Sequence, residues 1–368
     1  MKNLATLFLY LSCLIFIHCA NEPGVTSNST NDDININEQS DDDSSNDNNE
    51  DNDSDNDNDD STDSNDDTIP TDSSDPTGTT DTPTNPNVVV AFIGDQGLGS
   101  NAEAVLELIL AEGADMVLHQ GDFDYIDDAD AWDEQINSIL GDDFPYFASI
   151  GNHDITAWTN YQTKLTERLE RIEGASCEGD LGVNSACTYN DIFFILSGIG
   201  TSGSDHETYL EDELALTDAT WRICSWHKNQ ELMQIGSKSD EVGWEAYEIC
   251  REAGAIVATG HEHTYSRTHL MSDFENQIIE STDSTLIIEP GNSFVFVNGL
   301  GGKSIRDQDD TLAANPWWAS VYSEEQGANY GALFCSFNHD DELAEAYCYF
   351  KDIDDAVIDE FYLTSLNN

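Results

Sequence analysis

The sequence predicts an α/β fold, and three observations support this prediction. Apolar runs rich in β-branched residues alternate with stretches whose apolar residues recur at helical spacing. The first three runs end in short polar motifs, which are Gly-Asp, Gly-Asp and Gly-Asn-His-Asp. The last four runs have the pattern of antiparallel strands. Polar clusters at the carboxyl ends of strands are typical of α/β folds that build a site at that edge of the sheet.

The pattern places the elements in order along the chain. In the first half we expect strands within 87–95, 114–125 and 144–154, and helices within 100–113 and 127–141. Ser100 is the expected N-cap of the first helix. In the second half we expect helices within 208–219 and 241–254, and strands within 191–200, 220–230, 255–263, 293–303, 330–338, 344–350 and 356–363.

Composition divides the 368 residues into three parts. Residues 1–20 have the layout of a secretory leader, with one Lys followed by an apolar run, and a single N-terminal membrane anchor is the alternative. Residues 21–86 consist almost entirely of Asn, Asp, Ser, Thr and Pro and are predicted to be a disordered acidic linker. Their Asp and Asn repeats lack the glycine and the closing Glu of a calcium loop. Residues 87–368 are predicted to form one globular domain.

The end of the leader suggests a lipid anchor as well as export. Cys19 resembles the lipid-attachment cysteine of bacterial lipoproteins, although His18 stands where a small residue is usual. The expected location is therefore secreted or on the cell surface, with Cys19 as a membrane tether. The sequence sets no oligomeric state.

The chain is strongly acidic, with 74 Asp and Glu against 12 Lys and Arg. Of these, 53 acidic and 11 basic residues fall after the linker, so the globular part is itself acidic. Such a surface repels nucleic acid and anionic membranes, and we expect no nucleic-acid partner. It suits a salty medium, where screening weakens the self-repulsion.

Cysteine usage agrees with export. Outside the leader there are six cysteines, and their spacing suggests the pairs Cys177–Cys187, Cys224–Cys250 and Cys335–Cys348. The third pair has a local argument, because a hairpin centred on residues 339–343 would set its cysteines opposite each other. Six reduced buried thiols are the alternative. A metal site of thiolates is not expected, since no CxxC spacing occurs.

Oxygen and nitrogen ligands gather at the ends of five expected strands. They are Asp95, Asp122, Tyr125, Asn152, His153, His227, His261 and His263. Such a donor set suits Fe, Zn and Mn. Because side chains two residues apart point the same way in an extended segment, His261 and His263 can each reach one of two adjacent ions. Two ions about 3.5–4 Å apart clamp the attacking and leaving oxygens of a phosphoryl displacement.

These motifs resemble a known superfamily. "GDQG" (94–97), "GDFDY" (121–125), "GNHD" (151–154), His227 and "GHEH" (260–263) resemble, in order, the motifs of calcineurin-like metallophosphoesterases. Tyr125, "GHEHTYSRT", "YLEDEL" with "TWRICSWHK", "NGLGG" and "AVIDEFYL" resemble the purple acid phosphatase branch. The resemblance covers about 87–368 and implies a four-layer α/β/β/α sandwich with mixed sheets.

The resemblance also implies a role for each site residue. The first ion, ferric iron in that branch, would be held by Asp95, Asp122, Tyr125 and His263. The second ion, Zn, Mn or Fe, would be held by Asp122, Asn152, His227 and His261, so that Asp122 bridges the pair. His153 would contact the phosphate, and whether it also protonates the leaving oxygen stays open.

Each residue also has a plainer interpretation when it is taken alone. A strand-end Asp is usually a helix cap, a lone Tyr usually packs, and a lone His is usually a satisfied core residue. Only the set in family order favours a site. The sequence departs from the family after His227, where Lys228, Asn229 and Gln230 stand in place of further histidines. Lys228 is a candidate contact for an anionic substrate, together with Asn152 and His153.

The sequence therefore predicts an exported dinuclear metallohydrolase. It would cleave phosphomonoesters by attack of a metal-bound hydroxide, as an acid phosphatase does. A phosphodiesterase or nucleotide pyrophosphatase on the same site is the enzyme alternative. A catalytically inactive surface binding module is the alternative from another class of protein.

Overall fold

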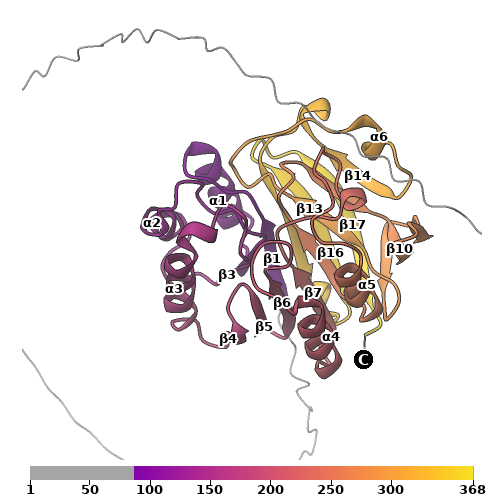
Figure 1. Cartoon of the computed structure of the whole chain (residues 1–368), viewed down its shortest axis with the longest axis horizontal. Helices are drawn as coiled ribbons and strands as arrows, with labels where there is room; N and C mark the ends of the chain where they lie inside the picture. The colour runs from indigo at the N-terminus through magenta and orange to yellow at the C-terminus, as the bar shows by residue number, and fades with distance from the viewer. Residues whose placement is uncertain (1–86, 368) are drawn as a thin grey trace, which may run out of the picture. The chain divides into compact units, whose positions relative to one another are not determined.

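Two large mixed β-sheets form the centre of residues 87–367, which are the residues that the computed structural model describes (Figure 1). The first sheet has seven strands in the order β12-β17-β16-β15-β1-β2-β3. The second sheet has eight strands in the order β14-β9-β13-β8-β7-β6-β5-β4, and β10 pairs with β11 separately.

The strands of the first sheet are β1 (Val88–Ile93), β2 (Met116–His119), β3 (Tyr146–Ala148), β12 (Thr285–Ile288), β15 (Gly331–Phe337), β16 (Glu345–Asp352) and β17 (Val357–Ser365). Those of the second sheet are β4 (Ser176–Asp180), β5 (Asn184–Tyr189), β6 (Ile192–Ser197), β7 (Trp221–Ser225), β8 (Ile256–Thr259), β9 (Tyr265–Thr268), β13 (Val295–Asn298) and β14 (Trp318–Tyr322). The separate hairpin consists of β10 (Leu270–Asp273) and β11 (Ile278–Ser281). The α-helices are α1 (Ser100–Ala111), α2 (Ala129–Ile139), α3 (Trp158–Leu169), α4 (His206–Leu216), α5 (Glu245–Glu252) and α6 (Asp310–Ala313).

Three apolar clusters show how the layers stack. One lies between the sheets and joins Val90 and Phe92 of β1 to Phe194 of β6. A second packs α1, α2 and α3 on the outer face of the first sheet, and a third packs α4 and α5 on the second sheet. The two groups of helices lie on opposite sides of the strands (Figure 1). The expected four-layer α/β/β/α sandwich is thereby confirmed.

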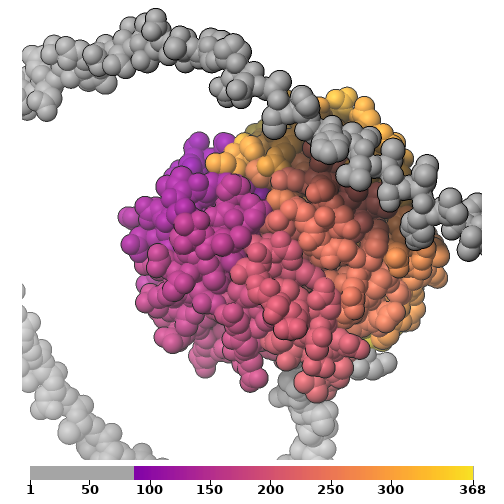
Figure 2. Space-filling model, viewed as in Figure 1, coloured from indigo at the N-terminus to yellow at the C-terminus, as the bar shows by residue number. Residues whose placement is uncertain are grey.

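Side chains fill the space between the layers. On β1, Val88, Val90 and Phe92 face the other sheet, whereas Ala91 and Ile93 face the helices. This strand is apolar on both faces because both faces are covered. On the face shown in Figure 2, the indigo-to-magenta and orange parts of the domain lie directly against each other.

The structure confirms the expected elements, most of them with narrower bounds, and corrects two details. Three elements extend beyond the expected range, since α4 begins at His206, β16 ends at Asp352 and β17 ends at Ser365. Ser100 is the first residue of α1 and not its cap, since Gly99 is the N-cap and no side chain caps the helix. The strand within 293–303 is not purely antiparallel, because β13 runs parallel to β8 and antiparallel to β9. The sequence pattern did not indicate α3, the β4–β5 hairpin, or β9 to β12 and β14.

The topology brings two sets of parallel strand ends together. In the first sheet β1, β2 and β3 are parallel, and in the second sheet β6, β7 and β8 are parallel. The five strands expected to deliver site residues are β1, β2, β3, β7 and β8. They belong to two sheets, which corrects the expectation of a single edge. No helix among residues 87–367 is long and apolar enough to cross a membrane.

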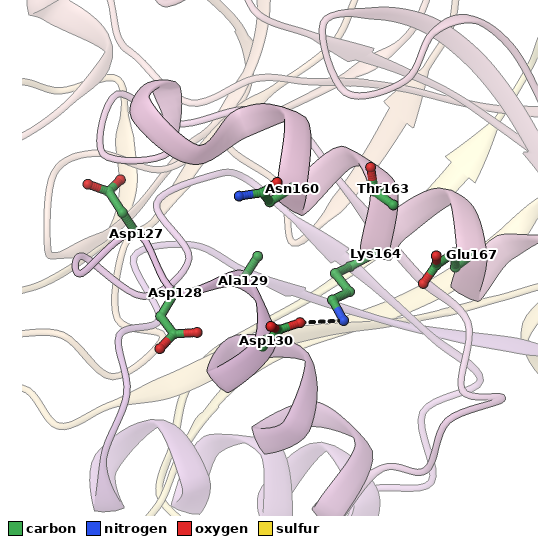
Figure 3. Close-up of a pocket in the computed structure, with 8 residues that line it drawn as sticks. All are labelled: Asp127, Asp128, Ala129, Asp130, Asn160, Thr163, Lys164 and Glu167. Atoms are coloured by element: carbon green, nitrogen blue, oxygen red, sulfur yellow. Dashed lines mark ion pairs between the residues drawn. The ribbon is translucent and has the colours of Figure 1, made fainter.

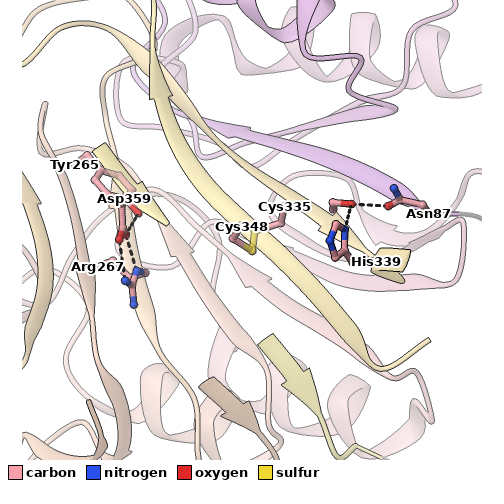
Figure 4. Close-up of a disulfide and its surroundings, with 8 residues drawn as sticks. Asn87, Tyr265, Arg267, Cys335, His339, Cys348 and Asp359 are labelled. Carbon is pink, nitrogen blue, oxygen red and sulfur yellow. Dashed lines mark hydrogen bonds and ion pairs between the residues drawn. A yellow bond between two sulfur atoms is a disulfide. The ribbon is translucent and has the colours of Figure 1, made fainter. Parts of the chain in front are cut away.

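All three expected cysteine pairs form disulfides, which are Cys177–Cys187, Cys224–Cys250 and Cys335–Cys348. Cys335 of β15 lies directly opposite Cys348 of β16 in the antiparallel register (Figure 4). Because disulfides persist in oxidising compartments, the three bridges indicate an extracellular protein.

The bridges predict a simple chemical result. Protein made in an oxidising compartment should show no alkylation of these six cysteines when it is denatured without a reductant, because all six sulfurs are paired. Peptide mass mapping after iodoacetamide treatment measures this, and a sample reduced first is the control. Alkylation of Cys224 or Cys250 without reduction would contradict the pairing.

Candidate metal centre

The site begins with two glycines that let neighbouring loops touch. A Cβ atom on Gly151 would lie 2.1 Å from the backbone nitrogen of Asp122, and one on Gly121 would lie 2.6 Å from the nitrogen of Gly151. Gly121 also has a positive φ of 86°. Larger residues therefore cannot take these positions without moving a loop. This contact explains why the motifs after β2 and β3 begin with glycine.

Asp154 fastens the same two loops. Its carboxylate accepts hydrogen bonds from the backbone N–H groups of Asp122 at 2.9 Å, Phe123 at 2.8 Å and Gly151 at 2.7 Å. The side chain is fully buried, and burial beside the Asp122 carboxylate raises the pKa of Asp154 to about 7. The motif "GNHD" contains Asp154, but its role could not be predicted from the motif. Its function is to hold the loop after β3 against the loop after β2.

The first group of site residues consists of Asp95, Tyr125 and His263. The phenol of Tyr125 donates to Oδ1 of Asp95 at 2.8 Å and lies 3.2 Å from Nε2 of His263. That same Nε2 lies 3.1 Å from Oδ1 of Asp95. The other ring nitrogen of His263 contacts Oγ of Ser304 at 2.5 Å. Three donor atoms from three loops therefore converge.

The second group consists of Asp122, His227 and His261. Nε2 of His227 lies 3.2 Å from Oδ2 of Asp122 and 3.0 Å from Nδ1 of His261. One ligand atom from each of the three lies within 4.8 Å of the others, which is an arrangement that could hold a metal ion. Nδ1 of His227 contacts the carbonyl oxygen of Gln120 at 2.7 Å, which leaves Nε2 facing the group.

The electrostatics of this second group are unfavourable for two protonated imidazoles. Burial opposes charge on His227, but the adjacent Asp122 carboxylate outweighs it and raises the pKa of His227 to about 9. Burial and the neighbouring His227 lower the pKa of His261 to about 3. Two facing ring nitrogens hold at most one proton between them, and a cation there would replace that proton.

The first group also favours a cation. Burial would raise the pKa of Asp95, but the imidazole of His263 outweighs it and the pKa falls below its ordinary value. Burial and the Asp95 carboxylate raise the pKa of the Tyr125 phenol far above its ordinary value. The phenol therefore keeps its proton unless a positive ion lies beside it.

Asn152 and His153 complete the predicted set. Oδ1 of Asn152 is buried and has no hydrogen-bond partner among the described residues. Asn152 and His261 line the same hollow. The ring of His153 lies against the ring of Tyr125, with centroids 4.6 Å apart, and its backbone N–H donates to Oδ1 of Asp122 at 2.8 Å. The structure thus gathers all eight predicted residues in one neighbourhood.

The backbone is strained where the site is built. Positive φ angles of 58° to 69° occur at four predicted site residues, which are Asp95, Asp122, Tyr125 and His261. Such angles are uncommon for non-glycine residues, and above all for a bulky side chain such as tyrosine. Strained residues gather at functional sites, where the surrounding structure holds them in place.

Positive charge is concentrated around the two groups. Lys238 lines the hollow beside His261, and Nζ of Lys303 lies 4.3 Å from the centroid of the Tyr125 ring. Nη1 of Arg306 donates to the carbonyl oxygen of His261 at 3.1 Å. With Lys228, these are four of the eleven basic residues that follow the linker. An acidic domain therefore gathers about a third of its basic residues here, two of which lie beside carboxylates, Lys228 with Glu241 and Arg306 with Glu262.

Lys228, the predicted substrate contact, has a partner within the protein. Its Nζ lies 2.5 Å from Oε1 of Glu241, whose Oε2 lies 2.8 Å from Nε2 of His261. Both residues line the hollow with Asn152. Glu241 was missed because its surrounding sequence, "SKSDEVG", has no motif. Lys303, Ser304 and Arg306 directly follow the motif "NGLGG", which was their only signal in the sequence. They were missed because the sequence did not show that β13 ends beside the parallel strand β8.

Another hollow lies away from these groups. Its wall is formed by the start of α2 and by α3, and Asp130 pairs with Lys164 across it at 2.6 Å (Figure 3). It contains none of the predicted ligands and no histidine. We assign it no role in the site.

A comparison with protein-family models matches part of the domain. Residues 88–265 match the model described as calcineurin-like phosphoesterase. The match identifies this segment, a little under half of the chain, as similar to calcineurin-like phosphoesterases. The matched segment contains every predicted site residue, from Asp95 to His263.

Solved structures show the same fold at low sequence identity. The purple acid phosphatase PPD1 from yellow lupin (Lupinus luteus) seeds is 17% identical, with a TM-score of 0.58, and the match covers 76% of this chain and 54% of the lupin protein. GAP50 of Plasmodium, described as the anchor in the inner membrane complex, is 14% identical, with a TM-score of 0.51 and coverage of 76% and 89%. No curated protein matches the sequence.

Proposed function

We propose that this protein is an exported dinuclear-metal phosphatase that hydrolyses phosphomonoesters. The observation that carries the proposal is the pair of adjacent donor groups, Asp95–Tyr125–His263 and Asp122–His227–His261. Each group supplies three side chains of the types that bind Fe, Zn or Mn. With Asp122 added, the first group is the set implied for an iron ion. With Asn152 added, the second group is the set implied for Zn, Mn or Fe.

The residues present fit two metal ions. Asn152 offers a buried carboxamide oxygen without a hydrogen-bond partner, which is costly unless something binds it. In the second group, Nε2 of His227 and Nδ1 of His261 face each other at 3.0 Å, as ring nitrogens do around a shared cation. Asp122 belongs to the second group and also raises the pKa of Tyr125 in the first, so its charge acts on both. It is the residue that would bridge the ions.

The protein groups then have distinct tasks in hydrolysis. When bound, the two ions lower the pKa of water and neutralise the charge on the phosphate oxygens. Lys238, Lys303 and Arg306 draw an anionic ester toward the site. Asn152 and Lys228, which line the same hollow, would contact the phosphate together with His153. His153, beside Tyr125, is the candidate donor of a proton to the leaving oxygen.

Export is supported by the disulfides and by the leader in the sequence. The three bridges suit an oxidising compartment. The leader, Cys19 and the linker lie outside the described residues, and the division at residues 20 and 86 stays a prediction from composition. Phosphate scavenging outside the cell is a purpose that fits an exported phosphatase.

One experiment tests the proposal and its alternatives. Purified full-length protein is analysed for metal content and assayed on a phosphomonoester and a phosphodiester of the same leaving group. We expect two ions per chain, one of them iron, and a higher kcat/KM on the monoester. A preference for the diester would favour a phosphodiesterase. Fewer than one ion per chain after reconstitution, with no hydrolysis, would favour a binding module, a class for which the anchor GAP50 offers a precedent of the same fold.

A further inference from the structure

Glu241 joins a lysine to a candidate metal ligand. Its Oε1 lies 2.5 Å from Nζ of Lys228 and its Oε2 lies 2.8 Å from Nε2 of His261. The side chain of Glu241 is only 25% exposed, and those of Lys228 and His261 are 17% and 7% exposed. Because burial reduces screening by water and salt, the electrostatic attraction in both contacts is stronger than it would be at the surface.

The contact uses the nitrogen of His261 that does not face the donor group. Nδ1 of His261 lies 3.0 Å from Nε2 of His227, inside the group of atoms that could hold an ion. Nε2 faces Glu241 instead. A carboxylate only accepts hydrogen bonds, so Nε2 must carry the proton. The lone pair of a neutral ring is then on Nδ1, where a metal would bind it.

The rest of His261 is already fixed by the backbone. Its N–H donates to Oδ2 of Asp95 at 2.8 Å, and its carbonyl oxygen accepts from Arg306 at 3.1 Å. These contacts set the position of the main chain but not the rotation or the tautomer of the ring. Glu241 supplies the missing restraint.

We propose that Glu241 is a positioning residue that sets the tautomer and orientation of His261, and thereby the affinity of the second metal ion, with Lys228 holding its carboxylate. The inference rests on the proposed function only in requiring a cation at Asp122, His227 and His261. Partners of this kind raise ligand basicity, and their loss typically weakens metal affinity about 10–100-fold. Lys228 then acts through Glu241 as well as lining the hollow.

The test measures metal affinity directly. Metal-free full-length protein is titrated with Zn²⁺ against a chromophoric chelator, and the two dissociation constants are compared among the wild type, Glu241→Ala and Glu241→Gln. Glu241→Ala should weaken one site about 10–100-fold and leave the other nearly unchanged. Glu241→Gln should keep part of the wild-type metal affinity, because its amide oxygen still accepts a hydrogen bond from Nε2 of His261. Glu245→Ala, an exposed charge four residues along the chain, is the matched control and should bind as the wild type does.

Several outcomes would overturn the inference. Unchanged affinity in Glu241→Ala would do so, and so would equal weakening of both sites. Melting of the metal-free variants separates a local effect from loss of the fold, since a lowered melting temperature with both sites weakened means a merely structural role. Lys228→Met should also weaken the same site, and a raised KM with unchanged metal affinity would remove the lysine from the proposal.

The metal titration distinguishes failure of the inference about Glu241 from failure of the proposed phosphatase function. Wild-type protein that binds two ions but hydrolyses no ester would refute the phosphatase and still permit the affinity comparison. Wild-type protein that binds no ion would refute both proposals.

Discussion

Replacing Asp122 with Asn should lower kcat/KM for a phosphomonoester about 10³-fold, which corresponds to roughly 4 kcal/mol of transition-state stabilisation. The change removes one negative charge with almost no change in shape. Oδ2 of Asp122 lies 3.2 Å from His227, and its charge also acts on Tyr125 in the first donor group. Loss of that charge should weaken both ion sites, and metal-assisted charge stabilisation is worth several kcal/mol.

The matched control is Asp127→Asn, five residues along the same loop. Asp127 is exposed and has a φ of 61°, a conformation that Asn also tolerates. It should keep wild-type activity and metal content. Steady-state assays with metal analysis of both variants measure the difference. If the Asp122→Asn variant were as active as the wild type, a metal-assisted mechanism that depends on Asp122 would be refuted.

Replacing Asp359 with Ala should lower the free energy of unfolding by about 3–5 kcal/mol, because it leaves a buried guanidinium without its counter-ion. Asp359 on β17 accepts hydrogen bonds from Arg267 at 2.6 and 2.9 Å and from the phenol of Tyr265 at 2.7 Å (Figure 4). Both partners lie on β9 of the other sheet, and the charged side chains are 6% and 7% exposed. Arg267 also lies 3.9 Å from the ring of Phe361.

The predicted loss should appear as a fall in melting temperature on the order of 10 °C. Glu360→Gln, the next residue on β17, removes the same charge from the surface and should change stability little, since exposed interactions are worth at most about 1 kcal/mol. Thermal unfolding followed by circular dichroism, with the metal content held equal, makes the comparison. Equal melting temperatures for the two variants would show that the buried ion pair does not join the sheets as described.

The alternation of apolar strand runs with amphipathic helical stretches along the chain made much of the fold predictable. Runs such as "NVVVAFIGD" and "AIVATGHEH" are apolar on both faces and end in polar motifs, so they identify buried parallel strands and their site-forming ends. The pairing direction of the strand within 293–303 was harder to predict, because β13 has one parallel and one antiparallel neighbour. Pairing direction depends on the route of the whole chain and leaves little trace within four residues. The helix α3 was missed because its stretch, "WTNYQTKLTERL", is mostly polar.

The candidate site was predictable where family motifs carry it. Asp95, Asp122 and His263 stand beside glycines or histidines at fixed spacing. In the structure Asp95 contacts His263, and Asp122 contacts His227. Glu241 was missed for a physical reason. It acts on other site residues through contacts that fold topology creates between distant loops, and such contacts need no fixed spacing in sequence. Asp154 stands within the motif "GNHD", but its role depends on backbone N–H groups, including those of Asp122 and Phe123, which the motif does not reveal.

The position of β1 has a consequence for biogenesis. This first strand of the domain lies between β2 and β15, and Val88 pairs with Phe337 near the end of the chain. Asp95 directly follows β1. During synthesis β1 can pair with β2 early, but it cannot pair with β15 until residues 331–337 have been made. Pairing across such a separation is slow to form. The strand that precedes Asp95 is therefore fixed late, and any metal ion that the first donor group binds would be bound only after the final strands have paired.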